Sequence, residues 1–226
     1  MMMKTKISKS LALAAMVSVL GVTMAQSARA DHPEDSHCAR FDAEPLTFVG
    51  SATECAPAPA GTHIVAADWA KGIGLPDDKG KSSKGLLLSK NGLTADCSSA
   101  GASIDGVGPS KKGKVPGITL TELGYDVRNG GHCGGGAPRF NVVATDGFHF
   151  MGACNNAVVT ADTPQVGWKR VRIDPTNPAH AFPPLAAGAT IISIDIVFDE
   201  GVDTGPDFSG FVIIDNIDIN GTLIGQ

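Results

Sequence analysis

LGYDVRNGGHCGGGAPRFNVV (residues 123–143) decides the fold class, because both of its ends carry the two-residue period of a β-strand. At the first end, Leu123, Tyr125 and Val127 alternate with residues of the opposite face. The second strand opens at Pro138, and its apolar side chains are those of Phe140, Val142 and Ala144. The Asn-Gly-Gly and Gly-Gly-Gly runs between them tolerate positive φ angles. We therefore expect two β-strands, with Tyr125 buried, joined by a glycine-rich loop that carries one cysteine.

Short apolar runs bounded by turn residues continue on both sides of this stretch from residue 62 onward. In the clearest run, Ile192, Ile194 and Ile196 alternate with mostly polar residues, which predicts a half-buried strand with this isoleucine row toward the core. The other expected strands cover residues 46–51, 63–69, 85–90, 93–96, 102–107, 148–151, 157–161, 167–173 and 211–219. Four prolines between residues 175 and 184 predict a long loop without regular structure. About ten short strands, turned by 28 glycines and 14 prolines, indicate an antiparallel sandwich or barrel.

The N-terminal residues 1–30 have the pattern of a cleaved signal peptide. A lysine-containing start precedes an apolar run at residues 11–25, and Ala28-Arg29-Ala30 forms a small-residue cleavage site. Residues 31–61 follow as an N-terminal arm with an alanine- and proline-rich linker, and residues 62–226 form the β-sandwich domain. The apolar run is shorter than the ~20 residues that a membrane span needs. We expect a secreted or periplasmic protein without membrane insertion.

The charge balance narrows the class of partner. The chain carries 18 basic and 23 acidic residues, and its formal net charge is −5 before the basic signal is removed. Nucleic acids call for clustered Lys and Arg side chains, so an acidic exported domain is a poor candidate for binding them. An extracellular glycan or a cell-surface ligand is the expected partner.

All five cysteines lie after the predicted signal, in a compartment that permits disulfide bonds. We expect a bridge between Cys133 and Cys154, which flank one predicted hairpin, and a second between Cys38 and Cys55. The odd count leaves one thiol over, which we expect to be a buried and inert Cys97.

Three strand motifs carry a resemblance to known domains: LGYDVR at 123–128, WKRV at 168–171 and IDNI at 214–217. Together they resemble the jelly-roll sandwiches of carbohydrate-binding modules and galactose-binding-like domains, over about residues 62–221. The stretch GHCGGGAPRFNV also resembles a family of secreted bacterial proteins, from which no activity is carried over. The resemblance implies an antiparallel jelly-roll β-sandwich that binds ligands at its loops or at one sheet face.

Sugar-binding domains present aromatic rings to the apolar face of a sugar, and this chain has only 5% aromatic residues. Trp69 is the best candidate for such a platform, although a core position for Trp69 stays open. Several arginines lie at the polar positions of their expected strands. This pattern predicts either one sheet face with salt bridges to Asp126 and Asp195, or a shallow site for an acidic or hydroxyl-rich ligand. These ligand-binding candidates are Arg128, Arg139 and Arg170, with Arg172 beside them.

Acidic residues near the C-terminus suggest a calcium site, since calcium takes six to eight oxygen ligands from flexible loops. The candidate ligands are Asp199, Asp203, Asp207 and Asp215. Solvated loop carboxylates are the alternative, because the spacing is not that of an EF-hand. The neighbouring His132 and Cys133 allow a metal or nucleophile hypothesis, but a disulfide at Cys133 favours a structural role.

The chain contains no nucleophile elbow, zinc-protease motif, phosphate-binding loop or dinucleotide fingerprint. The sequence therefore favours a secreted, non-catalytic domain that binds carbohydrate or another extracellular ligand. A structural or adhesive surface protein without a small-molecule site is the alternative. A hydrolase ranks third, because the two placed carboxylates of a glycosidase cannot be told apart among 23 acidic residues.

Overall fold

The computed structural model describes residues 41–50, 64–76, 83–110 and 116–225. Every described residue belongs to the second of the two units into which the chain divides, residues 38–226. The predicted signal peptide and the alanine- and proline-rich linker lie outside the described residues. Residues 42–49 of the predicted arm form an edge strand of the first sheet.

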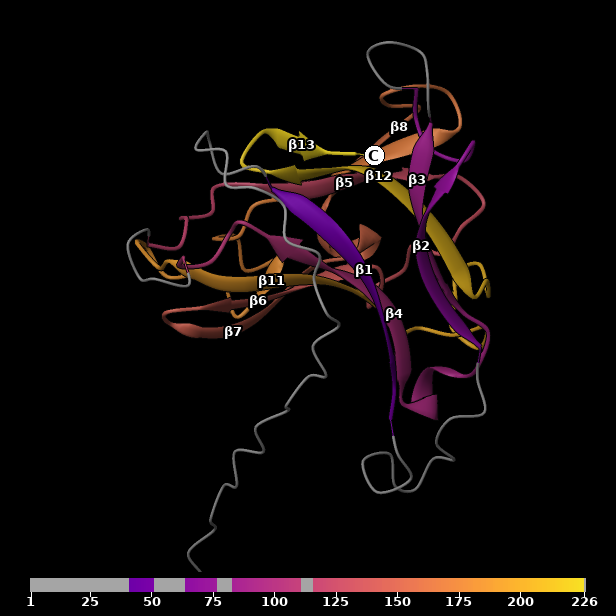
Figure 1. Cartoon of the computed structure of the whole chain (residues 1–226), viewed down its shortest axis with the longest axis horizontal. Coiled ribbons are helices and arrows are strands. Elements are labelled where there is room, and N and C mark those ends of the chain that lie inside the picture. Colours follow the sequence, from indigo (N-terminus) through magenta and orange to yellow (C-terminus); the bar gives the residue numbers. More distant parts are fainter. Residues whose placement is uncertain (1–40, 51–63, 77–82, 111–115, 226) are drawn as a thin grey trace, which may run out of the picture. The chain divides into compact units, whose positions relative to one another are not determined.

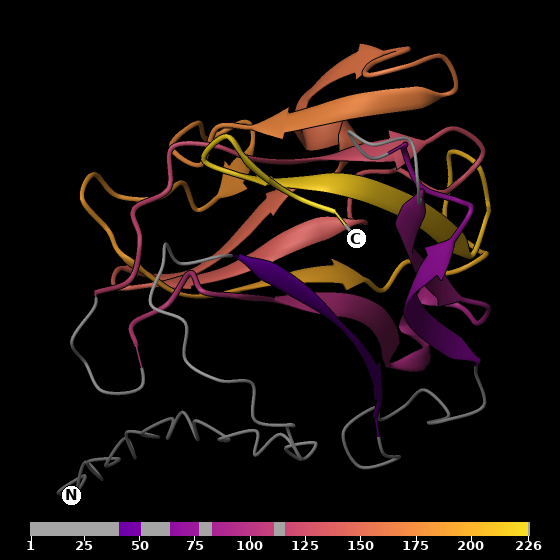
Figure 2. The ribbon, with the colours of Figure 1, turned by 45° about the horizontal axis from the view of Figure 1, so that its top comes forward.

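Two antiparallel sheets form the second unit, and they lie as two layers in Figures 1 and 2. Sheet A contains, in spatial order, β1 (Asp42–Val49), β4 (Ser98–Asp105), β11 (Ile191–Phe198), β6 (Arg139–Ala144), β7 (Gly147–Gly152) and β10 (Ala181–Phe182). Sheet B contains β2 (Val65–Lys71), β3 (Lys84–Lys90), β12 (Phe211–Ile219), β5 (Leu123–Arg128), β9 (Trp168–Ile173) and β8 (Val158–Ala161), and β13 (Thr222–Ile224) pairs with β12.

Successive strands pass repeatedly from one sheet to the other, as from β3 to β4, β4 to β5, β5 to β6 and β11 to β12. These crossings place sequence neighbours in opposite layers, which is the connectivity of a sandwich rather than of a meander. The predicted fold class, an antiparallel jelly-roll β-sandwich, is confirmed. Within the described residues, no helix is long and apolar enough to cross a membrane.

The core lies between the sheets and contains the apolar rows that the sequence predicted on β5 and β6. Leu123, Tyr125, Phe140 and Val142 are fully buried. The Tyr125 hydroxyl donates a hydrogen bond to the carbonyl oxygen of Pro138 at 2.8 Å. Burial raises the pKa of the Tyr125 hydroxyl, so this side chain stays neutral over the physiological range. The central stretch therefore contributes one buried strand to each sheet.

The predicted isoleucine row of β11 is wrong at one position. Ile191, Ile194 and Ile196 are fully buried, whereas Ile192 is 49% exposed. The pairing of β11 with β6 shifts register between Ile191 and Ser193. A β-bulge inserts one extra residue into a strand and reverses the parity of the side chains that precede it. The bulge turns Ile192 outward while the remainder of the row keeps its inward orientation.

Two local predictions are also wrong. A strand was expected at residues 93–96, but Thr94–Asp96 form a 3-10 helix. The Asp96 carboxylate accepts hydrogen bonds from the backbone N–H and the hydroxyl of Ser98, which favours a turn over an extended chain. The proline-rich segment contains β10, because Ala181 and Phe182 pair with Met151 and Phe150 of β7.

The disulfide between Cys133 and Cys154 is confirmed, with a Cα–Cα distance of 5.3 Å, and it closes the β6–β7 hairpin. Cys97 is disulfide-bonded as well, so its prediction as the unpaired thiol is wrong. The backbone places Cys97 directly before β4 with a positive φ of 60°, an arrangement that sequence spacing does not reveal. Cys38 and Cys55 lie outside the described residues.

Candidate functional site

A pocket of about 260 Å³ opens at the rim of sheet A, beside the edge formed by β7 and β10. We call residues 129–138, between β5 and β6, the glycine loop, and residues 199–210, between β11 and β12, the acidic loop. The residues that line the pocket include Gly135, Gly136, Arg139, Phe150, Asn156 and Phe182. The glycine loop therefore supplies one wall and sheet A the other.

Two phenyl rings form the apolar wall of the pocket. Phe150 of β7 and Phe182 of β10 are directly opposite each other in the ladder, so their side chains lie on the same face. Phe150 is 46% exposed and Phe182 is exposed to a similar degree. Phe148 packs against Phe150 in a T-shaped arrangement, with 4.8 Å between ring centroids. Exposed rings on an outer sheet face are available to stack on a ligand.

Arg139 forms the polar wall. Its guanidinium lies over the Phe150 ring, 5.4 Å from the centroid, in a cation–π contact. Its two terminal nitrogens donate to both carboxylate oxygens of Asp199, at 2.5 and 2.7 Å. Further hydrogen bonds go to the carbonyl of Gly136 and to the side-chain oxygen of Asn141. This forked pairing holds the guanidinium in one orientation beside the ring.

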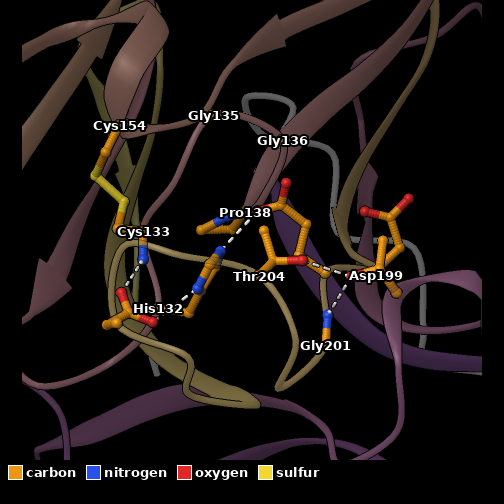
Figure 3. Close-up of polar contacts among 12 residues, drawn as sticks. His132, Cys133, Gly135, Gly136, Pro138, Cys154, Asp199, Gly201 and Thr204 are labelled. Atoms are coloured by element: carbon orange, nitrogen blue, oxygen red, sulfur yellow. Dashed lines mark hydrogen bonds and ion pairs between the residues drawn. A yellow bond between two sulfur atoms is a disulfide. The ribbon is translucent and has the colours of Figure 1, made fainter.

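His132 joins the glycine loop to the acidic loop (Figure 3). The imidazole is fully buried, and its Nδ1 contacts Asp207 at 2.8 Å while its Nε2 contacts Glu200 at 2.6 Å. Burial by itself raises the pKa of the Asp207 carboxyl. Hydrogen bonds from the Ser209 backbone and from His132 outweigh this effect and lower the pKa below its usual value. Sequence reasoning missed this contact because the partners lie 68 and 75 residues from His132.

The glycine loop lies against Glu200 where it lines the pocket. A Cβ added to Gly136 would overlap Glu200 Oε1, and one added to Gly134 would lie 3.0 Å from His132 Nε2. A side chain at Gly136 would therefore displace the Glu200 carboxylate, so glycine keeps the backbone and this carboxylate close together. Cys133 follows His132 and is tied by its disulfide to Cys154 at the start of the second 3-10 helix, Cys154–Asn156. The pocket wall is therefore fixed from both ends.

A polar row continues from the pocket across the outer face of sheet A. The strand registers place Phe150 beside Asn141, Asn141 beside Asp195, and Asp195 beside Ser103. Burial raises the pKa of the Asp195 carboxyl, although a hydrogen bond with Ser103 opposes part of the shift. The centre of this face is thus half-buried and polar, with the phenyl rings at one end.

Asp195→Asn is expected to change how stability depends on pH. The folded-state pKa of Asp195 lies above its unfolded value. Its contribution to stability is therefore fully present below the unfolded pKa of about 4 and is lost as the pH rises through the folded pKa. Asparagine does not ionise. The free energy of unfolding of the variant, relative to that of the wild type, should therefore increase as the pH rises from about 3.5 to 7. Urea unfolding across this range measures the difference.

The exposed Asp68→Asn variant on β2 is the control for a general loss of negative charge. A difference between wild type and Asp195→Asn that stays constant over this pH range, or that matches the Asp68→Asn difference, would contradict the expected role of burial at Asp195.

The arginines predicted to share one sheet face do not do so. Arg139 lies on sheet A, whereas Arg128 and Arg170 lie on sheet B, because the chain crosses between the layers from β5 to β6. Arg170 pairs with the fully buried Asp126, with Nε 3.0 Å from Oδ1. Arg128 donates to the carbonyl of Ile73 at 3.4 Å. The predicted common face is wrong, and Arg139 is the predicted arginine that lines the pocket.

Trp69 lies on β2, away from the pocket-lining residues. Its side chain is partly buried and packs against the core. The indole N–H donates to the carbonyl oxygen of Ala43 on β1 at 2.9 Å. This contact links the edges of the two sheets, and the predicted role of Trp69 as a sugar platform stays a prediction.

The four predicted calcium ligands have different partners. Asp199 binds Arg139, Asp207 binds His132, and Asp203 and Asp215 each accept a backbone N–H, from Thr94 and Leu75 respectively. Burial raises the pKa of Asp215. No group of three or more His, Cys, Asp or Glu side chains within the described residues is arranged to hold a metal ion. Calcium binding stays a prediction of the sequence.

Comparison with family models finds no match, and comparison with curated proteins finds none either. Two solved structures are similar. One is the family 11 carbohydrate-binding module of a cellulosomal cellulase of Clostridium thermocellum, with 16% identity over 81% of this chain and 88% of that chain and a TM-score of 0.38. The other is the family 11 module from Clostridium thermocellum in complex with a mixed-linked β-1,3-1,4 tetrasaccharide, with 16% identity over 81% of this chain and 97% of that chain and a TM-score of 0.40. Both are carbohydrate-binding modules, the class that the sequence motifs resemble.

Proposed function

We propose that this protein is a secreted, non-catalytic domain that binds carbohydrate in the pocket at the rim of sheet A. The observation that carries the proposal is the pair of exposed phenyl rings, Phe150 and Phe182, beside hydrogen-bonding groups in one concave site. Small-molecule sites combine apolar walls with a few placed polar groups in this way.

The chemistry of the pocket suits a sugar ring. A pyranose has an apolar C–H face that stacks on an aromatic ring and a rim of hydroxyls that needs donors and acceptors. Phe150 and Phe182 supply the apolar surface. Asn156 donates to the carbonyl of Gly135 at 2.8 Å, which orients its amide oxygen as an acceptor. The bare backbone of Gly135 and Gly136 allows a ligand to approach the main chain closely.

The lining favours binding over turnover. Its carboxylate neighbour, Asp199, is engaged by both terminal nitrogens of Arg139 rather than directed at a reacting atom. Arg139 and Asp199 are held by hydrogen bonds within the protein. The polar part of the site is therefore preformed and does not need to order when a ligand enters.

Phe150→Ala is expected to weaken retention on neutral polysaccharide by about three- to tenfold, because a ligand can bury only the exposed half of a ring whose full burial is worth roughly 1.5–3 kcal/mol. Affinity electrophoresis through soluble starch, xyloglucan, galactomannan and mixed-linkage β-glucan measures the effect. Phe48→Ala is the matched control. Phe48 is 44% exposed, and its register with Ser99 places it on β1, at the opposite edge of sheet A.

Equal losses of retention for Phe150→Ala and Phe48→Ala would show that the pocket is not the binding site. Absence of retention on all four polymers and on their carboxylate-bearing forms would reject carbohydrate binding by this protein. Release of new reducing ends from any of them would show a hydrolase instead.

A further inference from the structure

We propose that Asp199 determines the charge selectivity of the pocket: it neutralises Arg139, so that the site accepts neutral sugars and rejects sugars that carry a carboxylate. This inference rests on the proposed function, and it adds the class of sugar. It concerns a residue that does not itself line the pocket.

Most N–H groups of the Arg139 guanidinium already have acceptors within the protein. A free guanidinium in a sugar site would pair with a uronate carboxylate through two parallel hydrogen bonds, the strongest arrangement available to it. In this protein both terminal nitrogens already donate to Asp199. The Nε donates to Asn141, and a second hydrogen bond from Nη1 goes to Gly136. A carboxylate ligand would have to displace Asp199 from the pair.

The charged side chains around the pocket also disfavour an anionic ligand. Arg139 is the cationic residue of the pocket lining within the described part of the chain, and its charge is balanced by Asp199. Glu200 lies directly behind Gly136, and only 15% of its side chain is exposed. Asp207 lies on the other side of His132. An anionic sugar therefore meets a pocket whose guanidinium is already paired with a carboxylate, and two further carboxylates that share one imidazole lie close by.

The neutralised guanidinium can still contact a neutral ligand. Its Cζ lies 5.4 Å from the centroid of the Phe150 ring, so the guanidinium adds contact surface beside the ring for a sugar. Neutral hydroxyls can accept a hydrogen bond from a guanidinium without competing for its counterion. Asp199 thus removes the charge of Arg139 from recognition, and the side chain keeps its shape and the one Nη2 N–H that these four hydrogen bonds do not use.

The test compares each of the four neutral polysaccharides with the same polymer after its primary hydroxymethyl groups have been oxidised to carboxylates. A chelator is present throughout, so that bridging by calcium does not contribute. The wild-type protein should be retained by a neutral polymer and lose retention on its oxidised form. In Asp199→Asn, which has nearly the same shape, the ratio of affinities should move toward the oxidised polymer by about tenfold, because one nearby negative charge is removed.

Arg139→Gln combined with Asp199→Asn should cancel that gain, because the unmasked cation is then absent. Stronger wild-type retention on the oxidised polymers, or a ratio that Asp199→Asn leaves unchanged, would overturn the inference while carbohydrate binding itself stands. Failure of the wild type to bind any polymer, neutral or oxidised, would reject the proposed function and this inference with it.

Discussion

His132→Ala is expected to lower the free energy of unfolding by about 3 kcal/mol, toward the lower end of the roughly 2–6 kcal/mol that leaving two buried carboxylates without a hydrogen-bond partner would cost. The imidazole is fully buried and contacts Glu200 at 2.6 Å and Asp207 at 2.8 Å. Its loss leaves two carboxylates without their partner in a space that alanine does not fill. The lower end applies because the side chains of Glu200 and Asp207 are 15% and 31% exposed, and water can solvate part of each.

The His132 contact also shapes the pocket, because it joins the glycine loop to the acidic loop. Packing of the ring against Phe198, with 5.8 Å between centroids, adds an apolar share to the loss. Urea unfolding at neutral pH measures the change, and His180→Ala, in the loop before β10, is the control histidine. A change below about 1 kcal/mol, the size of an exposed ion pair, would show that the two carboxylates do not depend on His132.

Phe140→Ala is expected to lower the free energy of unfolding by about 4 kcal/mol, within the range for deleting a buried phenyl ring. Phe140 is fully buried on β6, between the strands that carry Met151 and Ile196. Its ring lies 5.9 Å from that of Tyr125 on the opposite sheet, so it joins the two layers. Deletion leaves a cavity that strands held by ladders on both sides cannot close.

Phe148→Ala is the matched control for Phe140→Ala, because it makes the same chemical change on the neighbouring strand β7, at an exposed position of sheet A. Its effect should stay below about 1 kcal/mol. Similar losses at the two positions would contradict the assignment of inner and outer faces to sheet A.

The two-residue period predicted the strands well where a strand is regular. Tyr125 and Phe140 lie in the core as expected, and the Tyr125 hydroxyl has the partner that a buried phenol needs. The period failed at Ile192, because a β-bulge changes parity without any mark in the residue types. It could not place Arg128 and Arg139 either, since strand parity does not say to which sheet each strand belongs.

The pocket was less predictable than the core. Arg139 was a candidate by its polar parity, but its partner Asp199 lies 60 residues away and was assigned to calcium instead. Phe182 lies in a segment whose prolines predicted no strand, and only pairing with Phe150 reveals its place on the ligand face. His132 was considered beside Cys133 alone. Each of these contacts depends on which loops the sandwich brings together at one end, and local pattern contains no such information.

The position of the binding surface is the central claim, and amide chemical-shift mapping tests it most directly. The isotope-labelled mature protein is titrated with oligosaccharides of the polymer that retains it best, and each amide is followed. We predict that the largest shifts fall at Gly135, Gly136, Gly152 and Asn156, with little change on sheet B. Shifts that gather around Trp69 or Arg128 instead, or shifts absent at saturating sugar, would contradict the account.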